Sequence, residues 1–128
     1  MSTEKSGFTL IELMVAVAIV GILATLAISN YLSFQCRSKQ AEAKANLGSI
    51  FATQQAYRSE YETYVSGVSK LGWAPSGTTR YAYSVIAADT TTFTVRALST
   101  LLDHDPTIDV WTIDQTKAII SRTNDCGS

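Results

Sequence analysis

Hydrophobic and polar residues are distributed very unevenly along this 128-residue chain. A polar leader at residues 1–7 is followed by an apolar run in which no residue from Leu13 to Cys36 is charged. The run is long enough to cross a bilayer as a helix. It lacks the short apolar core and small-residue cleavage site of an ordinary secretory signal, so we expect this segment to be retained.

Helix-forming residues continue after the apolar run. No proline occurs between Phe8 and Glu62, and residues 37–61 are rich in Ala, Glu, Lys and Gln. One helix over residues 8–62 would be about 80 Å long. Its second half has apolar residues at steps of three and four, which predicts a stripe packed against another layer. These residues are Leu47, Ile50, Phe51, Tyr57, Tyr61 and Tyr64.

Beyond the helix, the pattern changes to alternation. Residues 66–79 contain three glycines and one proline, which indicates a loop, and we expect Trp73 to pack this loop down. Four β-rich runs follow, with short turns that favour antiparallel hairpins. They cover residues 81–87, 92–98, 110–113 and 118–121.

These patterns predict an α+β fold, in which a long N-terminal helix serves as a spine and packs against a small antiparallel sheet. Four segments are expected: a leader (1–7), a hydrophobic transmembrane helix (8–36), an amphipathic helix half (37–65), and a loop plus β-sheet head (66–128).

Charge and motifs argue against several functions. The net charge is −1, from ten basic and eleven acidic residues. The basic residues Lys70, Arg80, Arg96, Lys117 and Arg122 are dispersed among acidic ones, so a nucleic-acid partner is not expected. No nucleophile motif or phosphate-binding glycine loop is present, so neither enzymatic activity nor a cofactor is expected.

One acidic segment leaves two interpretations open. It contains Asp103, His104, Asp105 and Asp109, and Asp114 follows it. The order of residues lacks the glycine and terminal glutamate of an EF-hand loop. We therefore favour a solvated loop that turns at Pro106, and a metal site is the alternative.

Glu12 is a single carboxylate at the start of the apolar run. A charge at the centre of a membrane helix costs about 2.5–3.5 kcal/mol and less near its end, so Glu12 calls for a partner. Water at the membrane surface is one candidate.

Another candidate comes from a family resemblance. The run Gly7-Phe-Thr-Leu-Ile-Glu-Leu-Met14, with Ala41-Glu-Ala-Lys-Ala-Asn-Leu47 downstream, resembles the N-terminal region of type IV pilins and pseudopilins. The resemblance implies that a prepilin peptidase cuts between Gly7 and Phe8 and that the new Phe8 amine is methylated. It also implies that Glu12 pairs with the Phe8 amine of a neighbouring subunit during assembly.

By this resemblance the chain is a structural subunit of a type IV pilus. A precursor in the bacterial inner membrane would be polymerised by pilus assembly machinery into an extracellular homopolymer used in motility, adhesion or DNA uptake. The alternatives are a pseudopilin of a type II secretion system and a membrane-anchored binding module that never polymerises. One departure from the family is Ser29, which stands where many relatives have a proline.

The chain has two cysteines, Cys36 and Cys126. In an oxidising compartment they could pair and tie the C-terminal tail to the helix. Two unpaired thiols are the alternative, because pairing depends on geometry that the sequence does not contain.

Overall fold

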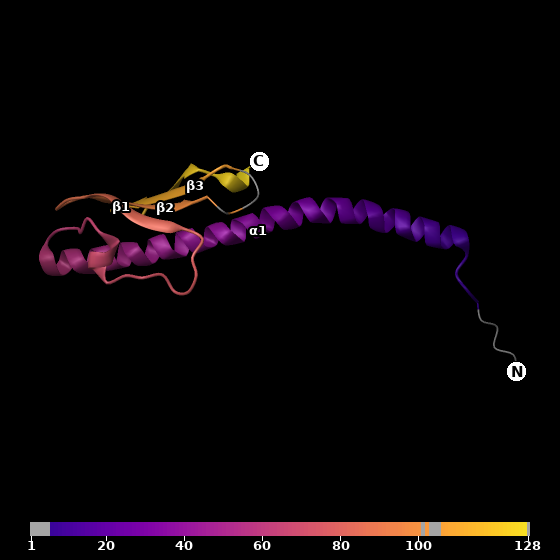
Figure 1. Cartoon of the computed structure of the whole chain (residues 1–128), viewed down its shortest axis with the longest axis horizontal. Helices are drawn as coiled ribbons and strands as arrows, with labels where there is room; N and C mark the ends of the chain where they lie inside the picture. Colours follow the sequence, from indigo (N-terminus) through magenta and orange to yellow (C-terminus); the bar gives the residue numbers. More distant parts are fainter. Residues whose placement is uncertain (1–5, 101, 103–105, 128) are drawn as a thin grey trace, which may run out of the picture. The chain divides into compact units, whose positions relative to one another are not determined.

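The computed structural model describes residues 6–100, 102 and 106–127. A long helix, α1 (Leu10–Tyr61), precedes a four-stranded antiparallel sheet with strand order β1-β2-β3-β4 (Figure 1). This confirms the predicted α+β fold. The chain divides into two compact units between Gln35 and Cys36, and we call the second unit the head. The remaining elements are η1 (Val68–Leu71), β1 (Ala82–Ala88), β2 (Phe93–Ser99), β3 (Asp109–Asp114), β4 (Ile119–Thr123) and η2 (Asp125–Gly127).

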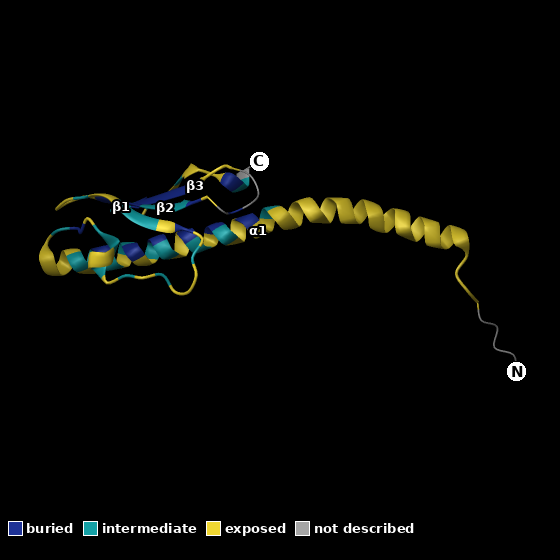
Figure 2. Cartoon of the chain, viewed as in Figure 1, coloured by how far each residue is buried: buried dark blue, intermediate teal, exposed yellow. Residues whose placement is uncertain are grey.

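The core of the head lies between the sheet and the C-terminal half of α1. Alternate residues of β2 are buried, as expected for a strand with one face on the core. The facing helix residues are buried at steps of four and three, which keeps them on one side of α1 (Figure 2). This buried stripe consists of Cys36, Gln40, Ala43, Leu47, Ile50 and Gln54.

The buried stripe differs in part from the predicted one. Tyr61 is 56% exposed at the end of α1, so its predicted place in the stripe is wrong. Tyr64 is buried, but it lies beyond the helix, with its ring 4.6 Å from that of Phe93. The stripe also begins earlier than predicted and includes two glutamines, because both find hydrogen-bond partners within the head.

Gln54 fixes the turn that follows α1. Its Nε2 donates to the Val65 carbonyl oxygen at 2.8 Å, and its Oε1 accepts from the Val65 N–H at 3.0 Å. The side-chain amide therefore pairs with a backbone peptide as a neighbouring strand would. Without this pairing, two buried backbone groups would lose their partners.

The two short hairpins, β1-β2 and β3-β4, each turn on an aspartate. The Asp89 carboxylate, between β1 and β2, accepts hydrogen bonds from the Thr91 and Thr92 N–H groups at 2.7 Å each. These bonds and those from the two threonine hydroxyls lower the pKa of Asp89 to about 2. Asp114 accepts from the Thr116 N–H at 2.8 Å in the turn between β3 and β4. The turns therefore use side-chain bonds that fix a tight reversal.

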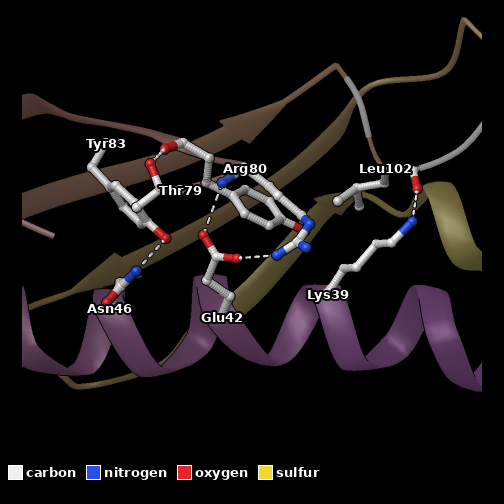
Figure 3. Close-up of polar contacts among 8 residues, drawn as sticks. Lys39, Glu42, Asn46, Thr79, Arg80, Tyr83 and Leu102 are labelled. Atoms are coloured by element: carbon white, nitrogen blue, oxygen red, sulfur yellow. Dashed lines mark hydrogen bonds and ion pairs between the residues drawn. The ribbon is translucent and has the colours of Figure 1, made fainter. Parts of the chain in front are cut away.

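Polar side chains on α1 hold the segment between the helix and the sheet (Figure 3). Glu42 accepts two bonds from Arg80, from the backbone N–H at 2.9 Å and from Nη1 at 3.0 Å.

Trp73 packs against the core, as predicted, and its Nε1 donates to Ser49 Oγ at 2.7 Å. Two further contacts from α1 are Asn46 Nδ2 to the Tyr83 hydroxyl and Lys39 Nζ to the Leu102 carbonyl oxygen.

Asp109, at the start of β3, is completely buried. Its Oδ2 accepts from the Tyr81 hydroxyl at 2.5 Å and from Trp111 Nε1 at 2.7 Å. Its Oδ1 accepts from Gln40 Nε2 at 3.0 Å and from the Asp125 N–H at 3.1 Å. The expectation that Asp109 belongs to a solvated loop is therefore wrong, because four donors replace water, three of them from distant parts of the chain.

The C-terminal tail is tied to α1. Cys36 and Cys126 form a disulfide with a Cα–Cα distance of 5.7 Å. Beside it, Gln40 Nε2 also donates to Asn124 Oδ1 at 2.8 Å. The tail is thus held by one covalent bond and by polar contacts on the same helix.

Candidate assembly site

The N-terminus of α1 is capped by reciprocal bonds between Thr9 and Glu12. The Thr9 N–H and hydroxyl donate to Glu12 Oε2 at 2.8 and 2.7 Å, and the Glu12 N–H donates back to Thr9 Oγ1 at 3.3 Å. This is a capping box, which satisfies N–H groups that a helix start leaves unpaired. The structure therefore gives Glu12 a partner within its own chain. The sequence contained the signal, a threonine three residues before a glutamate, but our interpretation did not use it.

Both bonds from Thr9 end on the same carboxylate oxygen. Among the residues that the structure describes, none donates to Glu12 Oε1. An ionised carboxylate has about four acceptor positions on its two oxygens, so Glu12 can hold Thr9 and a further donor together. The free oxygen is the chemically available part of the site.

Glu12 lies on an apolar face of the helix. A hollow on this face is lined by Glu12 together with Phe8, Ile11, Val15, Ala16 and Ile19. The steps of three and four between these residues place them on one side of α1. Phe8, the predicted first residue after cleavage, is 85% exposed beside the carboxylate. The face therefore offers an apolar surface with one charge and suits a partner that is apolar and carries one cation.

Gly7, the predicted cleavage position, has space around it. A Cβ built at Gly7 would meet no atom within 4 Å, and its φ lies outside the left-handed region. Neither packing nor backbone conformation within this chain therefore requires glycine there. A requirement for glycine would have to come from a molecule that binds this segment.

The N-terminal part of α1 has no cover in the single chain. Every residue from Ser6 to Leu32 is exposed (Figure 2). The helix is long and apolar enough to cross a membrane by length and composition. Exposed apolar area of this extent marks a site of contact with lipid or protein.

The helix remains regular where the family's proline is missing. Residues 27–30 are α-helical, and polar side chains nearby bond to backbone carbonyl oxygens. Thr25 Oγ1 donates to the Gly21 oxygen at 2.8 Å. Ser29 Oγ and Asn30 Nδ2 both donate to the Leu26 oxygen at 3.2 Å. Such bonds locally compete with the helix's own bonding and often bend a helix.

The metal alternative receives no support from the residues that can be placed. Asp103, His104 and Asp105 lie outside the described residues, and Asp109 is already occupied by four donors. Within residues 6–100, 102 and 106–127, no group of three or more His, Cys, Asp or Glu side chains could hold an ion.

Comparison with known proteins gives two family matches. Residues 34–124 match the family described as type IV pilin PilA, and residues 3–28 match the prokaryotic N-terminal methylation motif. The first match covers the head as far as residue 124, and the second covers Gly7, Phe8 and Glu12. Together they span both units of the chain.

Individual relatives agree with these matches. The type IV major pilin protein PilA of Myxococcus xanthus is 51% identical over 85 residues, which cover 66% of this chain and 39% of the relative. The type IV major fimbrial protein FimA of Dichelobacter nodosus is 37% identical, covering 59% of this chain and 47% of the relative. The type II secretion system core protein G of Pseudomonas aeruginosa is 38% identical, covering 58% of this chain and 54% of the relative.

The matched regions thus span only about half, or less, of each relative's length. The family match itself extends from the end of the apolar run to the last residues of the head, and that family is one of structural pilins. The chain therefore belongs to the type IV pilin PilA family.

Proposed function

We propose that this chain is the structural subunit of a type IV pilus and is assembled from the bacterial inner membrane into a helical surface filament. The observation that carries the proposal is the uncovered apolar face of α1 with Glu12 on it. Lipid would cover this face in the precursor, and other copies of the chain would cover it in the filament.

Burial of the apolar face supplies the favourable free energy of assembly. Leu10, Ile11 and Met14 are exposed by 77%, 70% and 63%. Complete burial of such a side chain from water contributes about 1.5–3 kcal/mol. Transfer from lipid contributes less, because lipid tails are already apolar, so close packing between helices becomes the larger factor. Apolar burial alone does not specify which register two helices adopt.

Glu12 would set that register. Cleavage between Gly7 and Phe8 creates an amine, and we propose that the Phe8 amine of one subunit pairs with Glu12 Oε1 of its neighbour. Two unit charges about 4 Å apart attract with about 4 kcal/mol at an effective dielectric of 20. Desolvation offsets much of this attraction, so the net gain is smaller. A misaligned subunit would leave both charges unpaired in an apolar bundle, which disfavours wrong registers.

The decisive experiment compares Glu12→Gln with Glu4→Gln. Glu12→Gln retains an acceptor for Thr9 but removes the charge, so it should be processed and stay in the membrane while the filament yield falls by about tenfold or more. Glu4→Gln makes the same change in the predicted leader and should assemble normally. Normal filament yield from Glu12→Gln would refute the proposed role.

Processing has its own test. Gly7→Val should block cleavage, because a branched side chain would obstruct a peptidase at a position where the chain itself leaves room. Mass spectrometry after co-expression with a prepilin peptidase should show the loss of residues 1–7 from the unaltered chain only. Methylation of Phe8 would add one methyl group to the processed chain.

A second candidate function is a secretion pseudopilin, because a type II secretion system core protein is among the relatives. Electron microscopy of fibres sheared from the cell surface separates the two functions, since a pilin would form long surface fibres that contain this chain. A membrane-anchored module that never polymerises would give no filament and no cross-link between copies at Phe8 and Glu12.

A further inference from the structure

The sheet has a second face, which points away from α1. Because neighbouring residues of a strand point to opposite sides, Arg96 on β2 faces away from the core that contains Val95 and Ala97. In the sheet register Arg96 lies between Ser84 on β1 and Thr112 on β3. We call this the outer face.

The outer face carries two arginines, exposed apolar side chains and one carboxylate, Asp114, which lies within electrostatic reach of Arg122. Arg122 on β4 donates through Nε to Thr112 Oγ1 at 3.3 Å, which places its guanidinium close to Arg96's strand neighbour. Ile86 on β1 is 52% exposed and Ile120 on β4 is 43% exposed. Two arginines and two isoleucines of this kind resemble the composition of protein interfaces, in which arginine and apolar groups are favoured.

Arg96 has an unused donor. Its Nε atom is shielded from solvent and has no hydrogen-bond acceptor among the residues that the structure describes. A shielded donor without an acceptor costs about 1–3 kcal/mol. Nε itself is out of reach of another molecule, but a carboxylate beside the partly exposed Arg96 side chain would stabilise its charge.

The opposite charge gathers at the C-terminal end of α1. Glu60 and Glu62 are both exposed there, where the helix dipole is negative and cations are preferred. Glu62 also has a φ of 58°, a left-handed conformation that usually requires glycine or asparagine at a helix end. In the described part of the chain the one ion pair joins Glu42 and Arg80, so Glu62 has no cationic partner.

Glu62 thus places a negative charge where the helix dipole favours a cation, and it adopts a backbone conformation that favours glycine. Residues that are locally unfavourable are expected where function requires them. Here the missing partner is a cation, and the outer face of the same head carries two. The two surfaces lie on different parts of the head, so a contact between copies would be heterologous. Repeated heterologous contacts that do not close into a ring generate helical filaments.

We propose that the acidic end of α1, with Glu62 at its centre, docks on the outer face around Arg96 of a second copy of this chain. This contact rests on the proposed filament function and adds a head-to-head interface to the helix contacts. The partner is identified by complementary charge, since the glutamates meet the arginines while the isoleucines exclude water.

Charge reversal in full-length chains tests the contact. Glu62→Arg and Arg96→Glu should each lower the yield of sheared filaments by about tenfold, because each places like charges together. The double reversal should restore the yield to within about twofold of the unaltered chain, because the two changes compensate. Failure of the double reversal to restore filaments, with each variant folded by circular dichroism, would overturn the proposal.

Glu62→Gly separates docking from a structural role. Glycine relieves the left-handed strain, so the head should unfold at the same or a higher temperature. If Glu62 acts only in the fold, filaments should form normally. If it docks, filaments should decrease although the head is at least as stable.

Cross-linking provides a direct readout. In filaments of the Arg96→Lys variant, a carbodiimide should join Glu62 to the new amine of another copy and give a ladder on a denaturing gel. Mass spectrometry should identify peptides linked between positions 62 and 96, and Glu62→Gln should abolish them. Filaments that form without this linkage would overturn the contact and leave the proposed function intact. Absence of filaments from the unaltered chain would overturn both.

Discussion

Replacement of Asp109 by asparagine should destabilise the head by about 1–3 kcal/mol. The substitution keeps the size of the side chain and removes one acceptor oxygen. The new amide nitrogen must occupy the position of either Oδ2 or Oδ1. At Oδ2 it faces the Tyr81 hydroxyl and Trp111 Nε1, and at Oδ1 it faces Gln40 and the Asp125 N–H.

Each orientation leaves one fixed donor unpaired. The Tyr81 hydroxyl can rotate to accept a bond, but an indole N–H can only donate. The Gln40 amide can turn over only by giving up its bond to Asn124 Oδ1, and the Asp125 backbone N–H cannot change at all. The loss is therefore that of one buried donor, about 1–3 kcal/mol. The absence of a buried charge in the variant offsets part of the loss, so we expect a value below the upper limit.

The assay is urea unfolding of the processed full-length chain in detergent micelles, followed by tryptophan fluorescence. Trp111 donates to Asp109 directly, so its emission reports on the altered site. Glu60→Gln is the control, because it makes the same change from carboxylate to amide at an exposed position near the end of α1. An unfolding midpoint for Asp109→Asn equal to that of the unaltered chain would refute the predicted role of Asp109. A loss of stability in the control equal to that of Asp109→Asn would refute it as well.

Three further predictions concern the same head. Gln54→Leu should cost about 1–3 kcal/mol for each of the two Val65 backbone groups that it leaves unpaired, and urea unfolding should record the loss. Cys36→Ser should cost about 2–5 kcal/mol, because the disulfide joins residues separated by 90 positions; equal unfolding midpoints for the variant and the oxidised chain would contradict this. The pKa of Asp89 is about 2 in the folded chain and higher in the unfolded chain, so its contribution is complete above about pH 4 and is lost as the pH falls towards 2. Circular dichroism during acid titration should therefore show a smaller loss for Asp89→Asn.

The sequence predicted the elements well because their signals are local. The alternation that predicted a strand at residues 92–98 agrees with β2 at Phe93–Ser99, and the predicted antiparallel hairpins are present. The absence of proline and the helix-forming composition predicted α1 closely. Each of these signals lies within a few residues of the structure that it specifies.

The polar part of the core could not be predicted in this way. Gln40 and Gln54 occupy buried positions in the helix stripe. A search for apolar residues at helical spacing does not select glutamine, so it does not predict their burial. Their burial depends on Asp109 and Val65, which become neighbours only in the folded chain. The prediction that Asp109 is solvated is wrong for the same reason. An acidic stretch of sequence indicates exposure to solvent, and the four donors that bury Asp109 come together only in the folded chain.

At the candidate assembly site, the residues could be identified from the sequence motif, but their hydrogen bonding could not. The motif pointed to Gly7, Phe8 and Glu12, and their roles in cleavage, methylation and assembly remain predictions. The structure adds that Thr9 occupies one oxygen of Glu12 and leaves the other open. That distinction depends on atomic geometry.

The position of the disulfide has a consequence for export. On the proposed route the chain would be exported from its N-terminal helix onwards, so Cys36 would emerge 90 residues ahead of its partner Cys126. The head could therefore not close covalently until Cys126, which follows all four strands of the sheet, has been delivered. A chain that stops short of Cys126 keeps an unpaired thiol next to its apolar helix. The bond would therefore form only in a chain whose four strands have all been exported.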